Sequence, residues 1–111
     1  MTLFTSLLVA KLNTDRLDAV SELFANFDRS DMPDRMGAVR RQLFTFHDLY
    51  FHLQDFESDT GTERIEAAKT EPEFVQISRE LRPYFEPYDP NWKSPRDSVA
   101  NRFYHWERNH G

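Results

Sequence analysis

The stretch from Arg40 to Phe56 constrains the fold most, because apolar and polar residues alternate along most of it. A period of two is typical of β-strands that have one apolar and one polar face. The pattern predicts two strands, over residues 39–46 and 49–56, joined by a turn at His47-Asp48 that lacks the glycine preferred in tight hairpins. In the second strand one face carries Leu49, Phe51 and Leu53, and the other carries Tyr50, His52 and Gln54. We expect the chemistry of the protein on this second, polar face.

The rest of the chain predicts further elements around this strand pair. They are, in chain order, a strand over residues 2–12, a helix from the caps Asn13 and Thr14 to Phe27, a loop over 28–37, helical segments with capping boxes at Thr60/Glu63 and Thr70/Glu73, an aromatic loop over 83–95, and a last strand over 98–107. The β-α-β-β-α-β order predicts a single α+β domain over residues 1–111, of the ferredoxin-like type with an antiparallel four-stranded sheet. Because such a sheet leaves one face uncovered, we expect a homodimer, a dimeric α+β barrel.

Charge and composition exclude several classes of protein. The net charge of −5 argues against a nucleic-acid partner, and the absence of cysteine excludes disulfides and thiolate chemistry. The sequence has no run of 18 apolar residues and no N-terminal signal pattern, so we expect a soluble cytoplasmic protein without a membrane partner. No two of the four histidines share the helical spacing of zinc motifs, so we expect no metal.

Several short strings resemble those of one known family. They are Met32-Pro33, Gly37, Arg40-Arg41, Leu43-Phe44, His47-Asp48-Leu49-Tyr50, His52-Leu53, Tyr88-Asp89-Pro90 and Phe103-Tyr104-His105-Trp106. On these strings, which span nearly the whole chain, the sequence resembles the small aromatic polyketide cyclases typified by the tetracenomycin cyclase. This family also includes spore-pigment and angucycline cyclases, and residues 41–56 are similar to the angucycline branch in particular.

The resemblance implies a dimeric enzyme that needs no cofactor. Such an enzyme closes a late ring of a bacterial aromatic polyketide by intramolecular aldol condensation with loss of water. One departure from the family is visible: a member carries a histidine just before the aspartate that matches Asp28, and here that position is Phe27. The resemblance therefore gives Asp28 less weight as a catalytic partner.

An aldol closure needs a base for the carbon between two carbonyls and a group that stabilises the enolate oxygen. We expect His52 to be the acid and base and the permanently charged Arg41 to be the stabiliser. Each residue also has a purely structural interpretation. His52 could be a buried structural histidine, and Arg41 could simply pair with a carboxylate. Further candidates for substrate binding are Tyr50, Gln54, Arg40, Arg35, Asp28 and Trp106.

The sequence thus predicts a cofactor-independent aromatic polyketide cyclase, with a type II polyketide synthase complex as an expected partner. Two alternatives stay open, a cofactor-free anthrone-type monooxygenase and a non-catalytic protein that steers the product of such a synthase. The sequence does not fix the polyketide chain length, the ring that is closed, or the angucycline or spore-pigment pathway.

Overall fold

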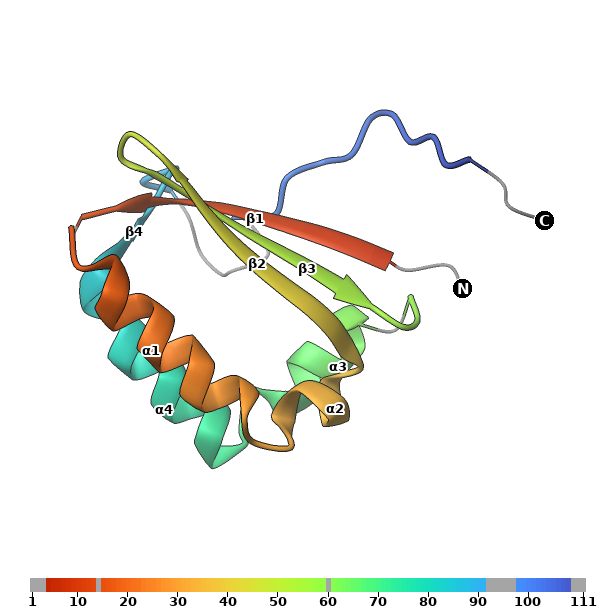
Figure 1. Ribbon diagram of the computed structural model, residues 1–111, viewed down its shortest axis with the longest axis horizontal. Helices are drawn as coiled ribbons and strands as arrows, with labels where there is room; N and C mark the ends of the chain where they lie inside the picture. Colours follow the sequence, from red (N-terminus) through yellow and green to blue (C-terminus); the bar gives the residue numbers. More distant parts are fainter. Residues whose placement is uncertain (1–3, 14, 60, 92–97, 109–111) are drawn as a thin grey trace.

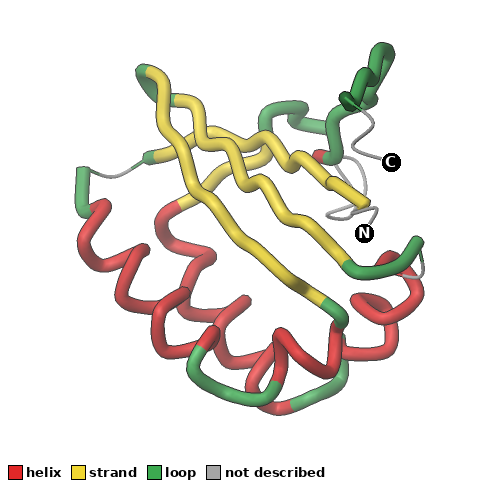
Figure 2. The backbone as a smooth tube through the Cα atoms, turned by 45° about the vertical axis from the view of Figure 1, so that its right-hand side comes forward, coloured by secondary structure: helices red, strands yellow, loops and turns green. Residues whose placement is uncertain are grey.

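A four-stranded antiparallel sheet carries helices on one of its faces in the computed structural model, which describes residues 4–13, 15–59, 61–91 and 98–108 (Figure 1). The strands are β1 (Phe4–Leu12), β2 (Ala38–Phe46), β3 (Leu49–Phe56) and β4 (Phe85–Pro87). They lie in the order β2-β3-β1-β4, and every neighbouring pair is antiparallel (Figure 2). This order confirms the predicted ferredoxin-like α+β fold.

The helices form a second layer beneath the sheet. They are α1 (Leu17–Asp28), α2 (Met32–Met36), α3 (Gly61–Ala68), α4 (Pro72–Leu81) and the 3-10 turn η1 (Arg82–Tyr84). Helices α1 and α4 run side by side, and α2 lies against α3 (Figure 1). The buried apolar core of this layer consists of Val20, Phe24, Phe27, Met32, Met36, Ala68 and Ile77. None of the helices in the described residues is long and apolar enough to cross a membrane.

Strand β3 turns its polar residues, rather than its apolar ones, towards the helices. Tyr50 and His52 are buried there, and the His52 ring packs edge-on against Phe24 of α1 with centroids 5.1 Å apart. The other side of the sheet, which we call the helix-free face, carries apolar residues that oppose one another in the strand register. They are Leu7 and Val9 on β1, Phe44 and Phe46 on β2, and Leu49, Phe51 and Leu53 on β3.

The predicted loop over residues 28–37 is wrong in its middle, where the short helix α2 forms. Met32 and Met36 lie one helical turn apart and are both buried, which gives the segment an apolar face. Pro33 is compatible with a first helical turn, and Gly37 ends the helix in the left-handed conformation at φ 75°. The proline and glycine that suggested a loop are therefore the start and stop of a helix.

Two predicted helix starts are also corrected. Helix α1 has Arg16 rather than Asn13 at its N-cap, because the Arg16 carbonyl accepts the first helical hydrogen bonds, from the N–H groups of Ala19 and Val20. The Asn13 N–H donates to the Tyr84 carbonyl, 3.0 Å away. Helix α4 has Glu71 rather than Thr70 at its N-cap, because a residue before proline is held in an extended conformation, here at ψ 138°. The caps predicted at Thr14 and Thr60 lie outside the described residues.

The predicted last strand over residues 98–107 is not formed, and the fourth strand lies instead in the predicted loop, at Phe85–Pro87. The turn η1 delivers β4 directly to the edge of β1, where Leu12 opposes Phe85. Farther along the same edge, residues 98–108 keep one bridge, Leu8 with Val99, and then leave the sheet. An edge position suits β4, because Pro87 has no N–H for a further strand.

Candidate active site

Arg41 is the centre of a polar cluster between β2, β3 and the end of α1. Its Nη1 lies 2.7 Å from Nε2 of His52 and donates to Oε1 of Gln54 at 3.1 Å. The strand register places Arg41 directly opposite Gln54 and diagonal to His52, so all three side chains share one face. The structure therefore brings the two predicted catalytic residues into direct contact.

Asp28, the last residue of α1, binds the outer edge of the same guanidinium. Its carboxylate accepts from Arg41 Nη2 at 2.9 Å and from Arg41 Nε at 3.0 and 3.2 Å. The C-terminal end of a helix carries a partial negative charge that repels a carboxylate, and the positive charge of Arg41 offsets this repulsion. The Arg41 side chain is only 10% exposed and Asp28 is 37% exposed, so Asp28 is the more accessible member of this pair.

Two phenylalanines of α1 complete the surroundings of the guanidinium. Phe24 and Phe27 place their ring centroids 5.1 and 5.7 Å from the Arg41 Cζ, within the range of cation–π contact. Positions 24, 27 and 28 lie on one helix face, because residues three and four apart are neighbours. Neither ring was among the predicted site residues, although the 24-27-28 spacing places both beside Asp28 on one helix face.

His52 is held as a neutral imidazole. Burial lowers its pKa to about 3, with a smaller contribution from the positive charge of Arg41. Since a guanidinium has donors only, Nε2 of His52 accepts the Arg41 hydrogen bond and the ring proton is on Nδ1. His52 thus has one lone pair, which Arg41 occupies in this structure, and its low pKa makes it a weak base as long as the site is buried and Arg41 is bound.

Tyr50 borders the cluster on the same strand face, with its ring 6.1 Å from that of His52 and 4.2 Å from that of Phe85. It is 4% exposed, and burial raises the pKa of its phenol above the usual range while the charge of Arg41 opposes this in part. Among the described residues, its hydroxyl has no hydrogen-bond partner. A buried hydroxyl of this kind is available to a ligand that enters the site.

The other predicted substrate-binding residues lie elsewhere. Arg40 points to the helix-free side, where it donates to Asp55 at 2.9 Å, and Arg35 of α2 pairs with Glu71 at 2.7 Å. Trp106 is 65% exposed in the C-terminal segment rather than in a core. His47 has a φ of 56° in the β2–β3 turn, which confirms the predicted turn. Within the described residues, no group of three His, Asp or Glu side chains is arranged to hold a metal ion.

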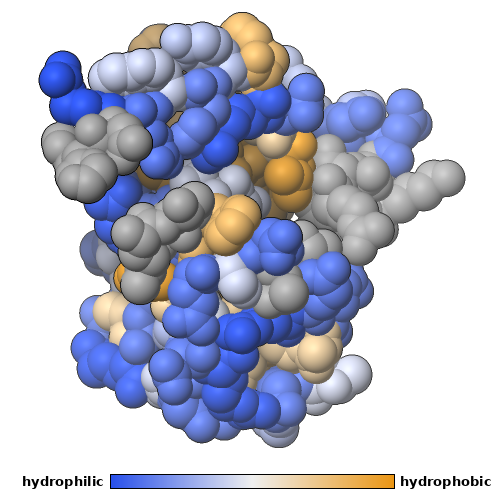
Figure 3. Space-filling model, turned by 90° about the vertical axis from the view of Figure 1, so that its right-hand side faces the viewer, coloured by the Kyte–Doolittle hydropathy of each residue, from blue (hydrophilic) through white to orange (hydrophobic). Residues whose placement is uncertain are grey.

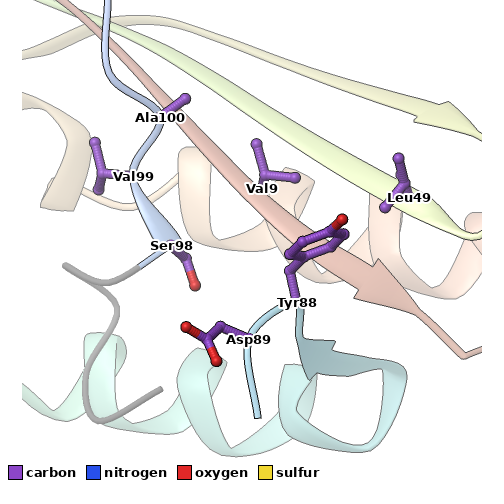
Figure 4. A pocket seen from close by; sticks show the side chains of 7 residues that line it. All are labelled: Val9, Leu49, Tyr88, Asp89, Ser98, Val99 and Ala100. Atoms are coloured by element: carbon purple, nitrogen blue, oxygen red, sulfur yellow. The ribbon is translucent and has the colours of Figure 1, made fainter. Parts of the chain in front are cut away.

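A separate pocket of about 300 Å³ lies on the opposite side of the sheet (Figure 4). Its lining residues are Val9, Leu49, Tyr88, Asp89, Ser98, Val99 and Ala100. Val9 and Leu49 belong to the helix-free face, so the sheet separates this pocket from His52 and Arg41. The pocket is therefore not the site of the chemistry expected on the polar face of β3.

The chain is similar to known proteins over nearly its whole length. Residues 4–107 match the family model described as polyketide synthesis cyclase. The polyketide synthase CurG of Streptomyces cyaneus is 39% identical over 104 residues, which cover 93% of this chain and 96% of that protein. Tetracenomycin F2 cyclase of Streptomyces glaucescens is 34% identical over 103 residues, 93% of this chain and 94% of its own length.

Solved structures add a comparison of the fold. The structure of tetracenomycin F2 cyclase, described as a type II polyketide cyclase, has a TM-score of 0.89 at 33% identity and covers 96% of this chain and 99% of its own. A cofactor-independent oxygenase, SnoaB of Streptomyces nogalater, has a TM-score of 0.55 at 15% identity, with coverage of 74% and 82%. The similarity to SnoaB shows a shared fold and nothing more.

Proposed function

Because this chain belongs to the family of polyketide synthesis cyclases, we propose that Arg41 and His52 are the catalytic pair with which it closes a ring of an aromatic polyketide. The family resemblance and the enzyme class expected from the sequence are confirmed by these relatives. The observation that carries the assignment of the pair is the 2.7 Å contact between Arg41 Nη1 and His52 Nε2 in a largely buried site.

The proposed reaction begins when a substrate carbonyl oxygen takes the Arg41 N–H that His52 holds in the free protein. The His52 lone pair is then released and removes a proton from the carbon between two carbonyls, while Arg41 stabilises the enolate oxygen. The enolate carbon forms a bond to a second carbonyl carbon of the same chain, whose oxygen takes up a proton. Loss of this hydroxyl group and a neighbouring proton as water completes the ring without an oxidant or reductant.

Asp28 acts in this proposal as a positioning residue. Its carboxylate fixes the plane of the guanidinium through two Arg41 nitrogens, which leaves Nη1 directed at His52 and Gln54. The position before it is Phe27, whose ring faces the guanidinium and cannot transfer a proton. Proton transfer is therefore assigned to His52 alone, and no cofactor takes part.

Gln54 and Tyr50 are proposed to orient the substrate. Arg41 donates only to the oxygen of the Gln54 amide, so the NH₂ group of Gln54 can donate to a second substrate carbonyl. The protonated phenol of Tyr50 can donate in the same way. A poly-β-carbonyl chain cyclises readily by itself, so these contacts and the aromatic walls serve to select one near-attack conformation.

The proposal extends to the assembly and the pathway. A second copy covers the helix-free face, where Phe44 and Phe46 are 49% and 64% exposed, and so forms a homodimer. The enzyme acts in the cytoplasm on the product of a type II polyketide synthase, in angucycline or related antibiotic or pigment biosynthesis, and closes a late ring.

The decisive experiment is mass spectrometry of a partly cyclised aromatic polyketide incubated with the purified protein. Loss of one water above the protein-free rate supports the cyclase. Gain of oxygen with oxygen consumption supports the monooxygenase, which the fold of SnoaB makes the second candidate. Binding without conversion supports the steering protein and rejects the catalytic pair.

A further inference from the structure

We infer that the substrate lies along the helix-covered face of β2, with its reacting end at Arg41 and its preformed rings extending past Leu43 to Thr45. Thr45 then limits the number of fused rings that the enzyme accepts. The inference rests on the proposed function, because Arg41 marks the reacting end only as a member of the catalytic pair. It assigns a role in substrate selection to two residues of β2 that the candidate active site does not use.

Two rows of side chains, one on β2 and one on β3, form this face beside the catalytic pair. The strand register pairs the members of the two rows one to one: Arg41 with Gln54, Leu43 with His52, and Thr45 with Tyr50. Residues that oppose each other on neighbouring strands have their side chains on the same face. Strands lie about 5 Å apart and rise about 3.4 Å per residue, so the two rows form a narrow surface about 14 Å long. A surface of this shape suits a planar ligand of several fused rings.

The polarity of this surface changes along its length. At one end, Arg41 and Gln54 supply hydrogen-bond donors. At the other end, Thr45 and Tyr50 carry hydroxyl groups. Between the two ends, Leu43 packs against the buried apolar core. A polycyclic phenol or ketone has the same distribution, with an apolar centre and oxygens at its rim, so it matches the surface in polarity as well as in shape.

Burial decreases along β2 from Arg41 to Thr45. The Arg41 side chain is 10% exposed, Leu43 is partly buried and Thr45 is exposed. At the Arg41 end, α2 packs against β2 and α3, whereas β2 diverges from the helices towards its turn with β3 (Figure 1). The end of the molecule that carries α2 and α3 presents mainly hydrophilic side chains in the space-filling view (Figure 3). A substrate that reacts at Arg41 therefore finds solvent in the direction of Thr45.

The other direction, past Asp28, is less suitable for the preformed rings. Asp28 is 37% exposed and its carboxylate binds the outer edge of the Arg41 guanidinium, so that edge is closed to the substrate. An ionised carboxylate is an acceptor only and repels the oxygens at the rim of a phenolic ligand. The Thr45 hydroxyl can donate a hydrogen bond to such an oxygen. The chemistry of the two ends therefore favours an extension towards Thr45.

Two unreactive ligands of different length test the placement. Dihydroxynaphthalene has two fused rings and dihydroxyanthraquinone has three. In an NMR titration of ¹⁵N-labelled protein with dihydroxyanthraquinone, we expect the backbone amide signals of residues 43–45 and 50–52 to shift. The signals of Val9, Tyr88 and Ser98 should stay constant, because these residues line the pocket on the other side of the sheet. Shifts confined to that pocket would overturn the inference.

A bulky residue at the open end should discriminate between the two ligands. Thr45→Trp places a large ring where the third fused ring would lie, and tryptophan is well tolerated in strands. We expect the Kd of dihydroxyanthraquinone, measured by isothermal titration calorimetry, to rise at least about 10-fold and that of dihydroxynaphthalene to rise less than about 2-fold. Gln42→Trp is the matched control, because Gln42 is an exposed residue of the same strand that points to the helix-free face. It should keep both Kd values.

The outcomes separate this inference from the proposed function. A protein that closes a ring in the mass-spectrometry assay, but in which Thr45→Trp changes both Kd values equally or neither, rejects the inference alone. A wild-type protein that converts no polyketide and binds neither ligand rejects the proposed function and the inference together. Ligand binding with the expected dependence on Thr45, but without conversion of a polyketide, supports the placement and rejects the catalytic pair.

Discussion

Arg41 donates a hydrogen bond to Nε2 of His52 from the neighbouring strand, across 2.7 Å, and so occupies the only lone pair of a neutral imidazole. Asp28 holds the far edge of the same guanidinium. Arg41 and His52 therefore form one unit in the free protein, and in the proposed mechanism the imidazole can act as a base only after an oxygen of the substrate has replaced it on Arg41. A substitution of either residue should therefore change both the geometry of the site and the binding of the substrate.

Adjacent arginines give a matched test of this unit. Arg41→Gln removes the charge that is proposed to stabilise the enolate, and we expect kcat/KM to fall by about 100- to 1,000-fold without reaching the protein-free rate. Arg40→Gln changes the next residue, which points to the opposite face and pairs with Asp55, and should keep kcat/KM near the wild-type value. Equal effects of the two substitutions in folded protein would contradict the role of Arg41.

The low pKa of His52 makes stability depend on pH. The folded-state pKa is about 3 and the unfolded value about 6.5, so between these values the unfolded chain binds the extra proton. The stabilisation is fully present above pH 6.5 and is lost as the pH falls towards 3. We expect the free energy of unfolding, measured in urea, to decrease by up to about 1 kcal/mol per pH unit from pH 6 to 4.

Two histidine variants isolate this contribution of His52. His52→Gln should remove it and flatten the pH profile relative to wild type. His47→Asn changes an exposed histidine in the β2–β3 turn, at a φ of 56° that asparagine tolerates, and should keep the wild-type slope. A His52→Gln profile as steep as that of wild type would show that other groups cause the slope.

Tyr50→Phe separates a substrate contact from a structural one. The phenol is buried without a hydrogen-bond partner among the described residues, so its removal should leave the free energy of unfolding unchanged or raise it slightly. In the enzyme assay we expect KM to rise severalfold and kcat to change less, because one contact to the substrate is lost. Unchanged kinetics together with lower stability would identify Tyr50 as a packing residue.

Asp55 is a buried carboxylate on the other face of the sheet, 4% exposed. It accepts hydrogen bonds from Arg40 at 2.9 Å and from the Thr5 hydroxyl at 2.6 Å. Asp55→Asn weakens both, and we expect a loss of about 1–3 kcal/mol in urea unfolding with kcat per folded molecule unchanged. Arg40→Gln should cost less, because Arg40 is 61% exposed. A larger loss for Arg40→Gln would reverse this assignment.

The local sequence pattern was sufficient to predict the two strands that carry Arg41 and His52, the proposed catalytic pair. The alternation in residues 40–56 predicts both β2 and β3 and puts His52 and Gln54 on one face, since strand periodicity depends only on neighbouring residues. The local pattern did not predict the fourth strand correctly, because strand pairing there depends on residues that are distant in the sequence. Residues 98–107 contain Val99 and three aromatic residues of the kind enriched in strands, yet they keep a single bridge, from Val99 to Leu8. The strand that pairs with Ala10–Leu12 at this edge is Phe85–Pro87, which η1 delivers to it.

The sequence by itself determined the ferredoxin-like order, the family, and the side chains that can carry an aldol reaction, because periodicity and residue chemistry are local properties. Only the tertiary structure decided which of the adjacent arginines joins His52, since that depends on the register and on which face the helices cover. It also decided that Phe24, Phe27 and Asp28 surround Arg41, because the end of α1 must first be packed against β2. The low pKa of His52 follows from that packing and not from the sequence around it.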